Sequence, residues 1–165
     1  MGLPNNIVQL LERRDALEPL LEDGTLELTV VTAPSADLRG LKAKIVPWSP
    51  SAERDALRVA HVGIMPLPDT PWAAGKCALK LLQYQAAGLA CVASPVGANT
   101  ALEGRGGVIL AADDGDWRRA FDALRCAEVR QRLGTRGRLL VEEAYSVQAW
   151  APKLAMMYRN VVVHR

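Results

Sequence analysis

The apolar positions along the chain switch repeatedly between helical spacing and short continuous runs. Residues 4–21 place leucine and isoleucine at helical spacing, which predicts an amphipathic helix. Residues 26–31 alternate and are rich in β-branched side chains, which predicts a strand. By the same criteria, further strands are predicted at 44–46, 61–66, 89–94 and 107–110, and further helices at 52–60, 76–88, 100–102, 117–125, 128–143 and from 146 onward.

This order of elements predicts the fold class. Strands that alternate with helices at this spacing favour a parallel sheet, and right-handed crossovers place helices on both of its faces. We therefore expect an α/β fold, a Rossmann-like doubly wound parallel sheet in a three-layer α/β/α arrangement with a helical C-terminus. No internal repeat or shift in composition divides the chain, so residues 1–165 are expected to form one domain.

Composition and charge narrow the function classes. The net charge of +2 is small and the basic residues are scattered, which argues against nucleic-acid binding. The three cysteines, Cys77, Cys91 and Cys126, form no CxxC pair and have no histidine at ligand spacing, so we expect buried thiols rather than a metal site. No apolar run reaches the length of a membrane span, and a cytoplasmic protein is the simplest expectation.

Candidate chemistry gathers after the predicted strand at 61–66. Ligands bind beyond the carboxyl ends of strands in open parallel sheets, and the helix predicted to begin near Gly75 would offer free N–H groups to a phosphate. Lys76, Lys80 and Gln83 follow at positions that share one helix face. This stripe could hold a diphosphate and a ribose, although solvated lysines on a surface helix are a commoner explanation of such a pattern.

Two familiar phosphate and metal motifs are not present. Thr70 stands where a P-loop needs its first glycine, and Cys77 stands where it needs serine or threonine. Residues 114–116 read Asp-Gly-Asp, but they precede an amphipathic run and are better explained as a loop and helix cap.

The stretch from His61 to Thr100, HVGIMPLPDTPWAAGKCALKLLQYQAAGLACVASPVGANT, resembles the donor-binding region of group 1 GT-B glycosyltransferases. Family members typically read D-[IV]-G-[IL]-M-P-L, a loop, G-K-x-x-x-K-x-L-Q-Y-M-A-x-G, and P-V-V-A-S-P-V-G. The likeness extends loosely to VPW at 46–48 and to the closing helices. Here His61 replaces the usual acid and Gln85 the usual methionine, and Ala90-Cys91 replaces Pro-Val.

The resemblance implies retaining transfer of a sugar from a nucleotide diphosphate sugar, with no metal or other cofactor. Lys76 and Lys80 would be the catalytic candidates, because cations can stabilise the leaving diphosphate. The donor-binding set implied by the resemblance is Trp48, Pro66, Gly75, Lys76, Cys77, Lys80 and Gln83. Gly75 and Gln83 occupy positions where the broader family has glutamates. The arginine and lysine that the family carries earlier in the domain have no clear counterpart.

The length has consequences for partners. GT-B enzymes bind the acceptor, here a cell-surface glycan, lipid or other saccharide, in an N-terminal domain, and 165 residues leave room for one half only. We therefore expect a nucleotide-sugar donor and a missing acceptor domain as partners, and weak or no transfer by this chain alone. For a glycosyltransferase half of this kind we expect a role in polysaccharide biosynthesis, peripheral membrane association of the full enzyme and a homodimer through exposed apolar surface.

Other interpretations remain open. The chain could be a non-catalytic nucleotide-binding or protein-interaction module that kept the fold, or an unrelated flavodoxin-like domain. The apolar face of the last helix, which includes Val147, Trp150 and Leu154, predicts that this helix packs on the body of the protein.

Overall fold

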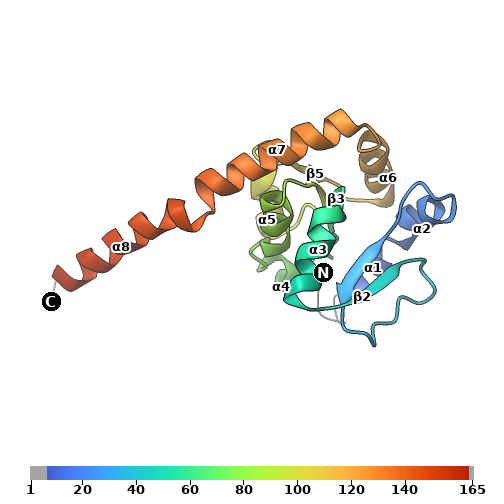
Figure 1. The fold of residues 1–165 in the computed structure, drawn as a ribbon, viewed down its shortest axis with the longest axis horizontal. Helices are drawn as coiled ribbons and strands as arrows, with labels where there is room; N and C mark the ends of the chain where they lie inside the picture. The colour runs from blue at the N-terminus through green and yellow to red at the C-terminus, as the bar shows by residue number, and fades with distance from the viewer. Residues whose placement is uncertain (1–6, 164–165) are drawn as a thin grey trace.

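The computed structural model describes residues 7–163, which form an α/β structure with a long C-terminal helix (Figure 1). The strands are β1 (Thr29–Thr32), β2 (Lys44–Pro47), β3 (Val62–Met65), β4 (Ala90–Ala93) and β5 (Val108–Leu110). The helices are α1 (Ile7–Leu11), α2 (Arg14–Glu22), α3 (Pro50–Val59), α4 (Pro71–Ala74), α5 (Leu79–Ala86), the 3-10 helix η2 (Gly97–Leu102), α6 (Asp114–Ala123), α7 (Ala127–Ala144) and α8 (Val147–Val163).

Every strand pairing is parallel, and the strands form two small sheets. One sheet has the order β1-β2 and the other the order β3-β4-β5. Val30 lies opposite Ile45 in the first sheet, and Ile64 lies opposite Val92 in the second. The predicted Rossmann-like α/β class is therefore confirmed. Instead of one continuous sheet, however, the described residues show a sheet divided between β1 and β3.

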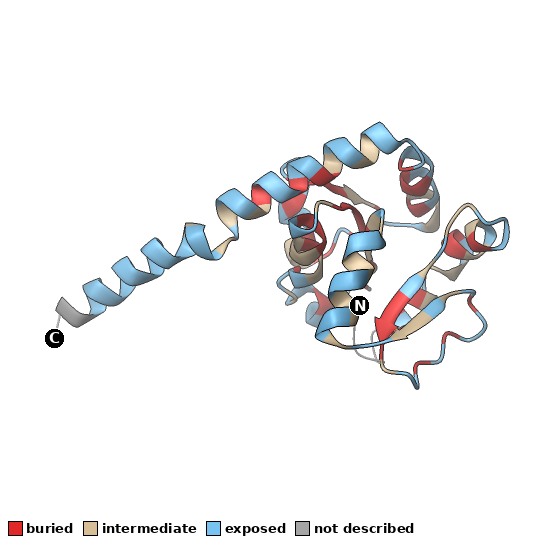
Figure 2. Ribbon diagram, viewed as in Figure 1, coloured by how far each residue is buried: buried red, intermediate tan, exposed pale blue. Residues whose placement is uncertain are grey.

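Strand β4 shows how the three layers are held together. All four of its residues are buried, because a strand covered on both faces exposes neither set of its alternating side chains. In Figure 2 the buried residues gather inside the body of the protein, whereas α8 is exposed over nearly all of its length. Ala90 and Val92 belong to a core with α1, α2 and α6, whereas Cys91 and Ala93 belong to a second core with α4 and α5. The expected α/β/α layering follows from these two cores.

The first predicted helix is divided in the structure. Of residues 4–21, 4–6 lie outside the described residues, and the rest form α1 and α2 with a turn at Glu12 and Arg13. The Arg13 guanidinium lies 3.2 Å from an Asp114 carboxylate oxygen at the start of α6. This ion pair ties the turn to a helix more than a hundred residues later in the chain, which helical spacing alone does not reveal.

The helix predicted to begin at Lys76 begins three residues later. The Lys76 backbone N–H donates to the Ala73 carbonyl at 3.1 Å and closes the turn of α4. Ala78 then takes a left-handed conformation with φ of 54°, and α5 starts at Leu79. Lys76 and Cys77 therefore lie in the connection between two helices, and the prediction that Lys76 belongs to the α5 face is wrong.

The last helix does not pack as predicted. Its apolar residues Val147, Trp150, Leu154, Met157 and Val161 are between 49% and 77% exposed, and α8 leads away from the body of the protein (Figure 1). Two residues, Tyr145 and Ser146, separate α7 from α8, and the chain continues outward instead of turning back toward the core. Within residues 7–163, no helix has the length and hydropathy that a bilayer crossing requires.

Candidate functional site

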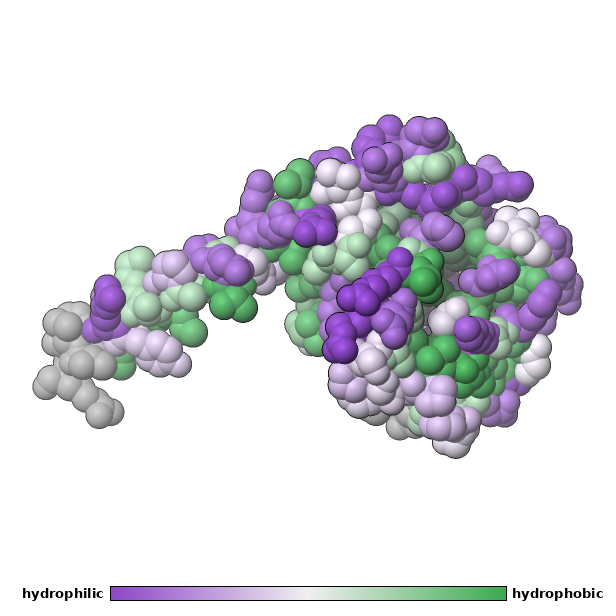
Figure 3. All heavy atoms as spheres, viewed as in Figure 1, coloured by the Kyte–Doolittle hydropathy of each residue, from purple (hydrophilic) through white to green (hydrophobic). Residues whose placement is uncertain are grey.

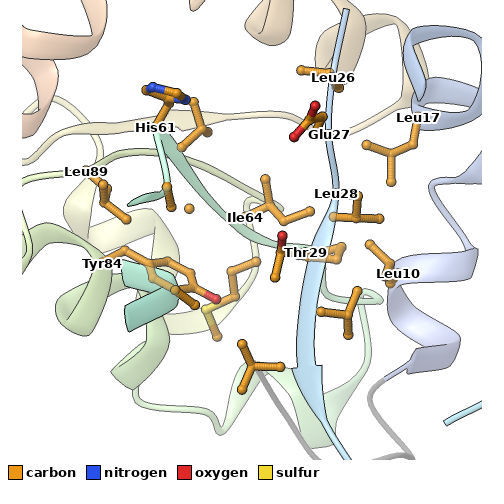
Figure 4. A pocket seen from close by; sticks show the side chains of 18 of the residues that line it. Leu10, Leu17, Leu26, Glu27, Leu28, Thr29, His61, Ile64, Tyr84 and Leu89 are labelled. Carbon is orange, nitrogen blue, oxygen red and sulfur yellow. The ribbon is translucent and has the colours of Figure 1, made fainter. Parts of the chain in front are cut away.

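The candidate site lies where β3 ends. Pro66 and Leu67 follow this strand and border a cavity of about 750 Å³ between the two sheets. Figure 4 shows the cavity between β1 and β3, with Leu28 and Thr29 on one side and Ile64 on the other. Of the predicted site residues, Pro66, Lys76 and Lys80 line this cavity. Both lysines thus line one cavity with Pro66, which follows the carboxyl end of β3, the end at which such folds bind ligands.

Lys80 is held by a carboxylate from another helix. Its ammonium nitrogen lies 3.4 Å from Glu53 Oε1 in α3, and the two side chains are only 30% and 15% exposed. Glu53 Oε2 accepts a hydrogen bond of 2.8 Å from the Trp48 indole N–H, just after β2. The hydrogen bond from Trp48 and the charge of Lys80 hold the pKa of Glu53 below its usual value. Elements β2, α3 and α5 are joined by this chain of contacts.

Lys76 has a different environment. Its ammonium nitrogen lies 4.2 Å from the centre of the Trp72 ring, a cation–π contact. The same nitrogen donates to the Gln9 side-chain oxygen in α1 at 3.4 Å. Partial burial lowers the pKa of Lys76, because desolvation disfavours the charged form. An anion placed beside this nitrogen would restore the favourable environment that the ammonium group lost on leaving water.

Several contacts fix the loop that carries Lys76. Thr70 caps α4 by accepting the Ala73 N–H at 3.2 Å, and the Ser94 hydroxyl accepts the Leu67 N–H at 3.0 Å. Gly97 has φ of 54°, and a Cβ there would collide with the Ala74 carbonyl. Only glycine allows this close approach of η2 to α4 without strain. The segment between Pro66 and Lys76 is therefore held against the carboxyl ends of β3 and β4.

The remaining predicted residues do not line the cavity. Trp48 is 58% exposed and reaches the site through Glu53. Gly75 ends α4, and a Cβ there would lie 3.5 Å from the nearest atom, so packing does not require glycine. Cys77 is exposed, and Gln83 is half-buried with its side-chain oxygen buried and unpaired. The structure brings Pro66 and the two lysines together, but it does not bring these four into the cavity with them.

Three contributors to the site were not predicted: Glu53, Gln9 and Trp72. Glu53 lies 27 positions from Lys80 and Gln9 lies 67 positions from Lys76, distances over which the sequence shows no periodic signal. Trp72 lies between the strand predicted at 61–66 and the helix predicted at 76–88, where no helix is predicted, and the structure places it in the short helix α4.

The arrangement can bind an anion beside flat aromatic surfaces. Two ammonium groups approach the strand end, and two exposed indoles, Trp48 and Trp72, lie next to them. Within residues 7–163, no group of three or more His, Cys, Asp or Glu side chains is placed to hold a metal ion. The lysines that line the described cavity are Lys76 and Lys80.

Comparisons with known proteins bear on the fold. No protein-family model matches the chain. No curated protein matches it either. Among solved structures, an α,α-trehalose-phosphate synthase (UDP-forming) from Burkholderia vietnamiensis is similar, with a TM-score of 0.64 and 14% sequence identity. The match covers 93% of this chain and 42% of that one, so the chain spans less than half the length of this neighbour. At this identity, the likeness shows the fold: a Rossmann-like α/β/α unit as found in GT-B glycosyltransferases.

Proposed function

We propose that this chain is the nucleotide-sugar-binding domain of a retaining glycosyltransferase. The observation that carries the proposal is that Lys76 and Lys80 line one cavity together with Pro66, just after β3. The fold that holds them matches a trehalose-phosphate synthase (UDP-forming) over 93% of this chain. The donor would be a nucleotide diphosphate sugar, and the acceptor would be held by a domain that these residues do not form.

The roles follow from the chemistry of the side chains. Departure of a nucleoside diphosphate concentrates negative charge on the phosphate oxygens, and preorganised cations stabilise that charge most when they are partly desolvated. Lys76 and Lys80 are partly buried and so meet this condition. Pro66 and the exposed Trp48 and Trp72 would border the nucleoside.

The other candidates have more limited roles in this proposal. Gly75 and Cys77 flank Lys76 in the α4–α5 connection and would contribute backbone N–H groups. Gln83 has a buried, unpaired side-chain oxygen, so it could accept a ribose hydroxyl only after its side chain turns outward. Gln83 would therefore contact the ribose only in a ligand-bound state in which its side chain has rearranged.

One observation favours the alternative of a non-catalytic module. Glu53 lies 3.4 Å from Lys80 and neutralises one of the two cations that the transfer reaction would use. A binding or interaction module that kept the fold could retain such a pair for stability alone. Under this alternative, removal of either lysine would change stability without changing nucleotide affinity.

Calorimetry separates the two functions. We would titrate the chain with UDP, GDP, ADP and their sugar conjugates, and repeat the titration with Lys80→Ala and Lys76→Ala. Each substitution should weaken binding of the preferred nucleotide by about 1–2 kcal/mol, the scale of one charge-assisted contact. Lys42→Ala, an exposed lysine outside the site, is the matched control and should bind as the parent does. Equal affinities in all four proteins would contradict the proposed roles.

A further inference from the structure

Helix α8 exposes a regular stripe of large apolar side chains. Val147, Trp150, Leu154, Met157 and Val161 follow one another at alternating intervals of three and four positions. Such intervals keep side chains on one narrow face of a helix, as at the a and d positions of a coiled coil. The five residues are between 49% and 77% exposed. Figure 3 shows hydrophobic side chains on the protruding helix with no other element over them.

The pattern favours a second helix over a membrane surface as the occupant of this stripe. A helix that lies on lipid combines a wide apolar face with a strongly charged opposite face. The opposite face of α8 instead carries Met156, which is 58% exposed, and the helix has only two charged side chains, Lys153 and Arg159. A narrow seam of a and d residues is the surface that two helices bury between them.

The largest side chain of the stripe is already held in a conformation that a second helix can cover. The Trp150 indole N–H donates to the Ala144 carbonyl, at the end of α7, at 2.7 Å. The Lys153 ammonium nitrogen lies 4.8 Å from the centre of the Trp150 ring. Burial of Trp150 would therefore leave its N–H paired, so the cost of burying an unsatisfied polar group does not arise.

The stripe offers an area close to what a stable dimer needs. An interface of ordinary size removes roughly 800 Å² from water on each partner. Each residue of the stripe, and Tyr158 beside it, can bury roughly 100 Å², since a fully buried aromatic side chain accounts for about 150–250 Å². These six residues and the aliphatic stem of Lys153 approach the required area when the whole helix takes part. The area therefore predicts a reversible dimer.

The place of the body relative to α8 decides the orientation of the two helices. The body is joined to the amino-terminal end of α8 (Figure 1). Two parallel helices would bring both bodies to the same end of the pair, whereas antiparallel helices separate the bodies. Antiparallel helices also place the positive end of each helix dipole beside the negative end of the other. The antiparallel arrangement is therefore favoured.

The apolar seam and the length of the helix agree on one antiparallel register. Leu154 would face Met157 of the second copy, and Trp150 would face its Val161. This register is centred between residues 155 and 156, and α8 runs from 147 to 163, so its midpoint is residue 155. The two helices would therefore overlap along their whole length. Lys153 would lie near Asn160 of the second copy, so no two cations meet across the seam.

We propose that two copies of this chain associate through their α8 helices, which form an antiparallel pair with twofold symmetry. The stripe of Val147, Trp150, Leu154, Met157 and Val161 is the contact surface. None of the described α8 residues lines the cavity that holds Lys76 and Lys80. The association is therefore independent of nucleotide binding.

Sedimentation equilibrium of the full chain, from roughly 1 µM to 1 mM, measures the association. We expect a monomer–dimer equilibrium. Leu154→Glu places an unpaired charge at the centre of the seam and should weaken dimerisation at least about tenfold. Met156→Glu is the matched control, because Met156 is similarly exposed but lies on the opposite face of α8, and it should change the dimer Kd less than about twofold. Circular dichroism spectra that match the parent's establish that both variants fold.

Electron paramagnetic resonance measures the orientation. A nitroxide label is attached to Gln148→Cys in a chain whose exposed Cys77 and Cys126 are replaced by serine. The two labels should lie roughly 25 Å apart in the antiparallel pair and roughly 10–15 Å apart in a parallel pair. The short distance would overturn the antiparallel arrangement.

Three outcomes of the sedimentation experiment would overturn the proposal. They are a chain that stays monomeric at every concentration, a dimer that Leu154→Glu leaves intact, and a dimer that Met156→Glu weakens as much as Leu154→Glu does. Binding of the monomer to phosphatidylglycerol vesicles that Leu154→Glu abolishes would assign the stripe to a membrane surface instead. No nucleotide takes part in these experiments, so the proposed function is tested separately.

Discussion

The carboxylate of Glu53 should oppose anion binding at the candidate site. Glu53 lies 3.4 Å from the Lys80 ammonium nitrogen. The Coulomb energy at that distance ranges from about 1 kcal/mol in water to about 5 kcal/mol at an effective dielectric constant of about 20. Desolvation and side-chain ordering cancel much of this attraction, so roughly 1 kcal/mol remains. Replacement of Glu53 by glutamine removes this competition while the glutamine oxygen can still accept the Trp48 indole N–H.

We therefore expect Glu53→Gln to bind the preferred nucleoside diphosphate about fivefold more tightly, the affinity change that corresponds to 1 kcal/mol. Isothermal titration calorimetry at constant ionic strength measures the effect. Asp55→Asn is the matched control, because Asp55 lies on the same helix and its pair with Arg58 is largely exposed. Unchanged or weaker binding by Glu53→Gln would refute the reasoning, and weaker binding would indicate that Glu53 itself contacts the nucleotide.

The Glu53–Lys80 pair should make the stability of the fold depend on pH. The folded-state pKa of Glu53 lies below its ordinary value of 4.5, so the stabilisation by its carboxylate is complete above that pH and is lost as the pH falls through the folded-state pKa. The Tm difference between the parent chain and Glu53→Gln should therefore be constant near neutral pH and shrink below about pH 4.5. A difference that stays constant down to pH 3 would contradict this assignment.

Three further predictions concern stability and packing. Trp117→Ala should lower the free energy of unfolding by about 3–5 kcal/mol, whereas Trp150→Ala should lower it by less than about 1 kcal/mol. The reason is that Trp117 is 0% exposed and Trp150 is 49% exposed. Denaturant unfolding of the two variants and the parent chain measures both changes. Gly97→Ala should cost about 1–3 kcal/mol through the Ala74 contact and the left-handed backbone, again by unfolding. Burial raises the pKa of the Cys91 thiol, so at pH 8 a thiol reagent should modify the two exposed cysteines and leave Cys91 unmodified until the protein unfolds.

Much of the fold could be predicted because the relevant signals are local. Alternation in residues 26–31 and continuous apolar runs such as 89–94 identify strands, since strand side chains repeat every two residues. Helical spacing identified α3, α6 and α7 to within a few residues. The start of α5 was missed because the conformation of Ala78 is imposed by how α4 and α5 meet, and alanine itself has no preference for a left-handed backbone.

The candidate site could be predicted only in part. Lys76 and Lys80 follow a recognisable strand, and their place at its carboxyl end is a consequence of parallel topology. Glu53 and Gln9 lie on helices whose sequences indicate only which helix face is apolar and which is polar. Their contacts with the lysines depend on how those helices pack over the sheet, and that packing is not encoded in any local pattern.

The sequence by itself determined most of the elements and their order, the α/β class and the position of two lysines after a predicted strand, because each of these depends on residues a few positions apart. The tertiary structure alone decided the Glu53–Lys80 pair, the division of the sheet between β1 and β3 in the described residues and the course of α8. Apolar residues at helical spacing indicate that a helix has a face to bury, but they do not indicate which surface will cover it. Similarly, an apolar strand has two edges to pair, but only the packed sheet shows which strands become its neighbours.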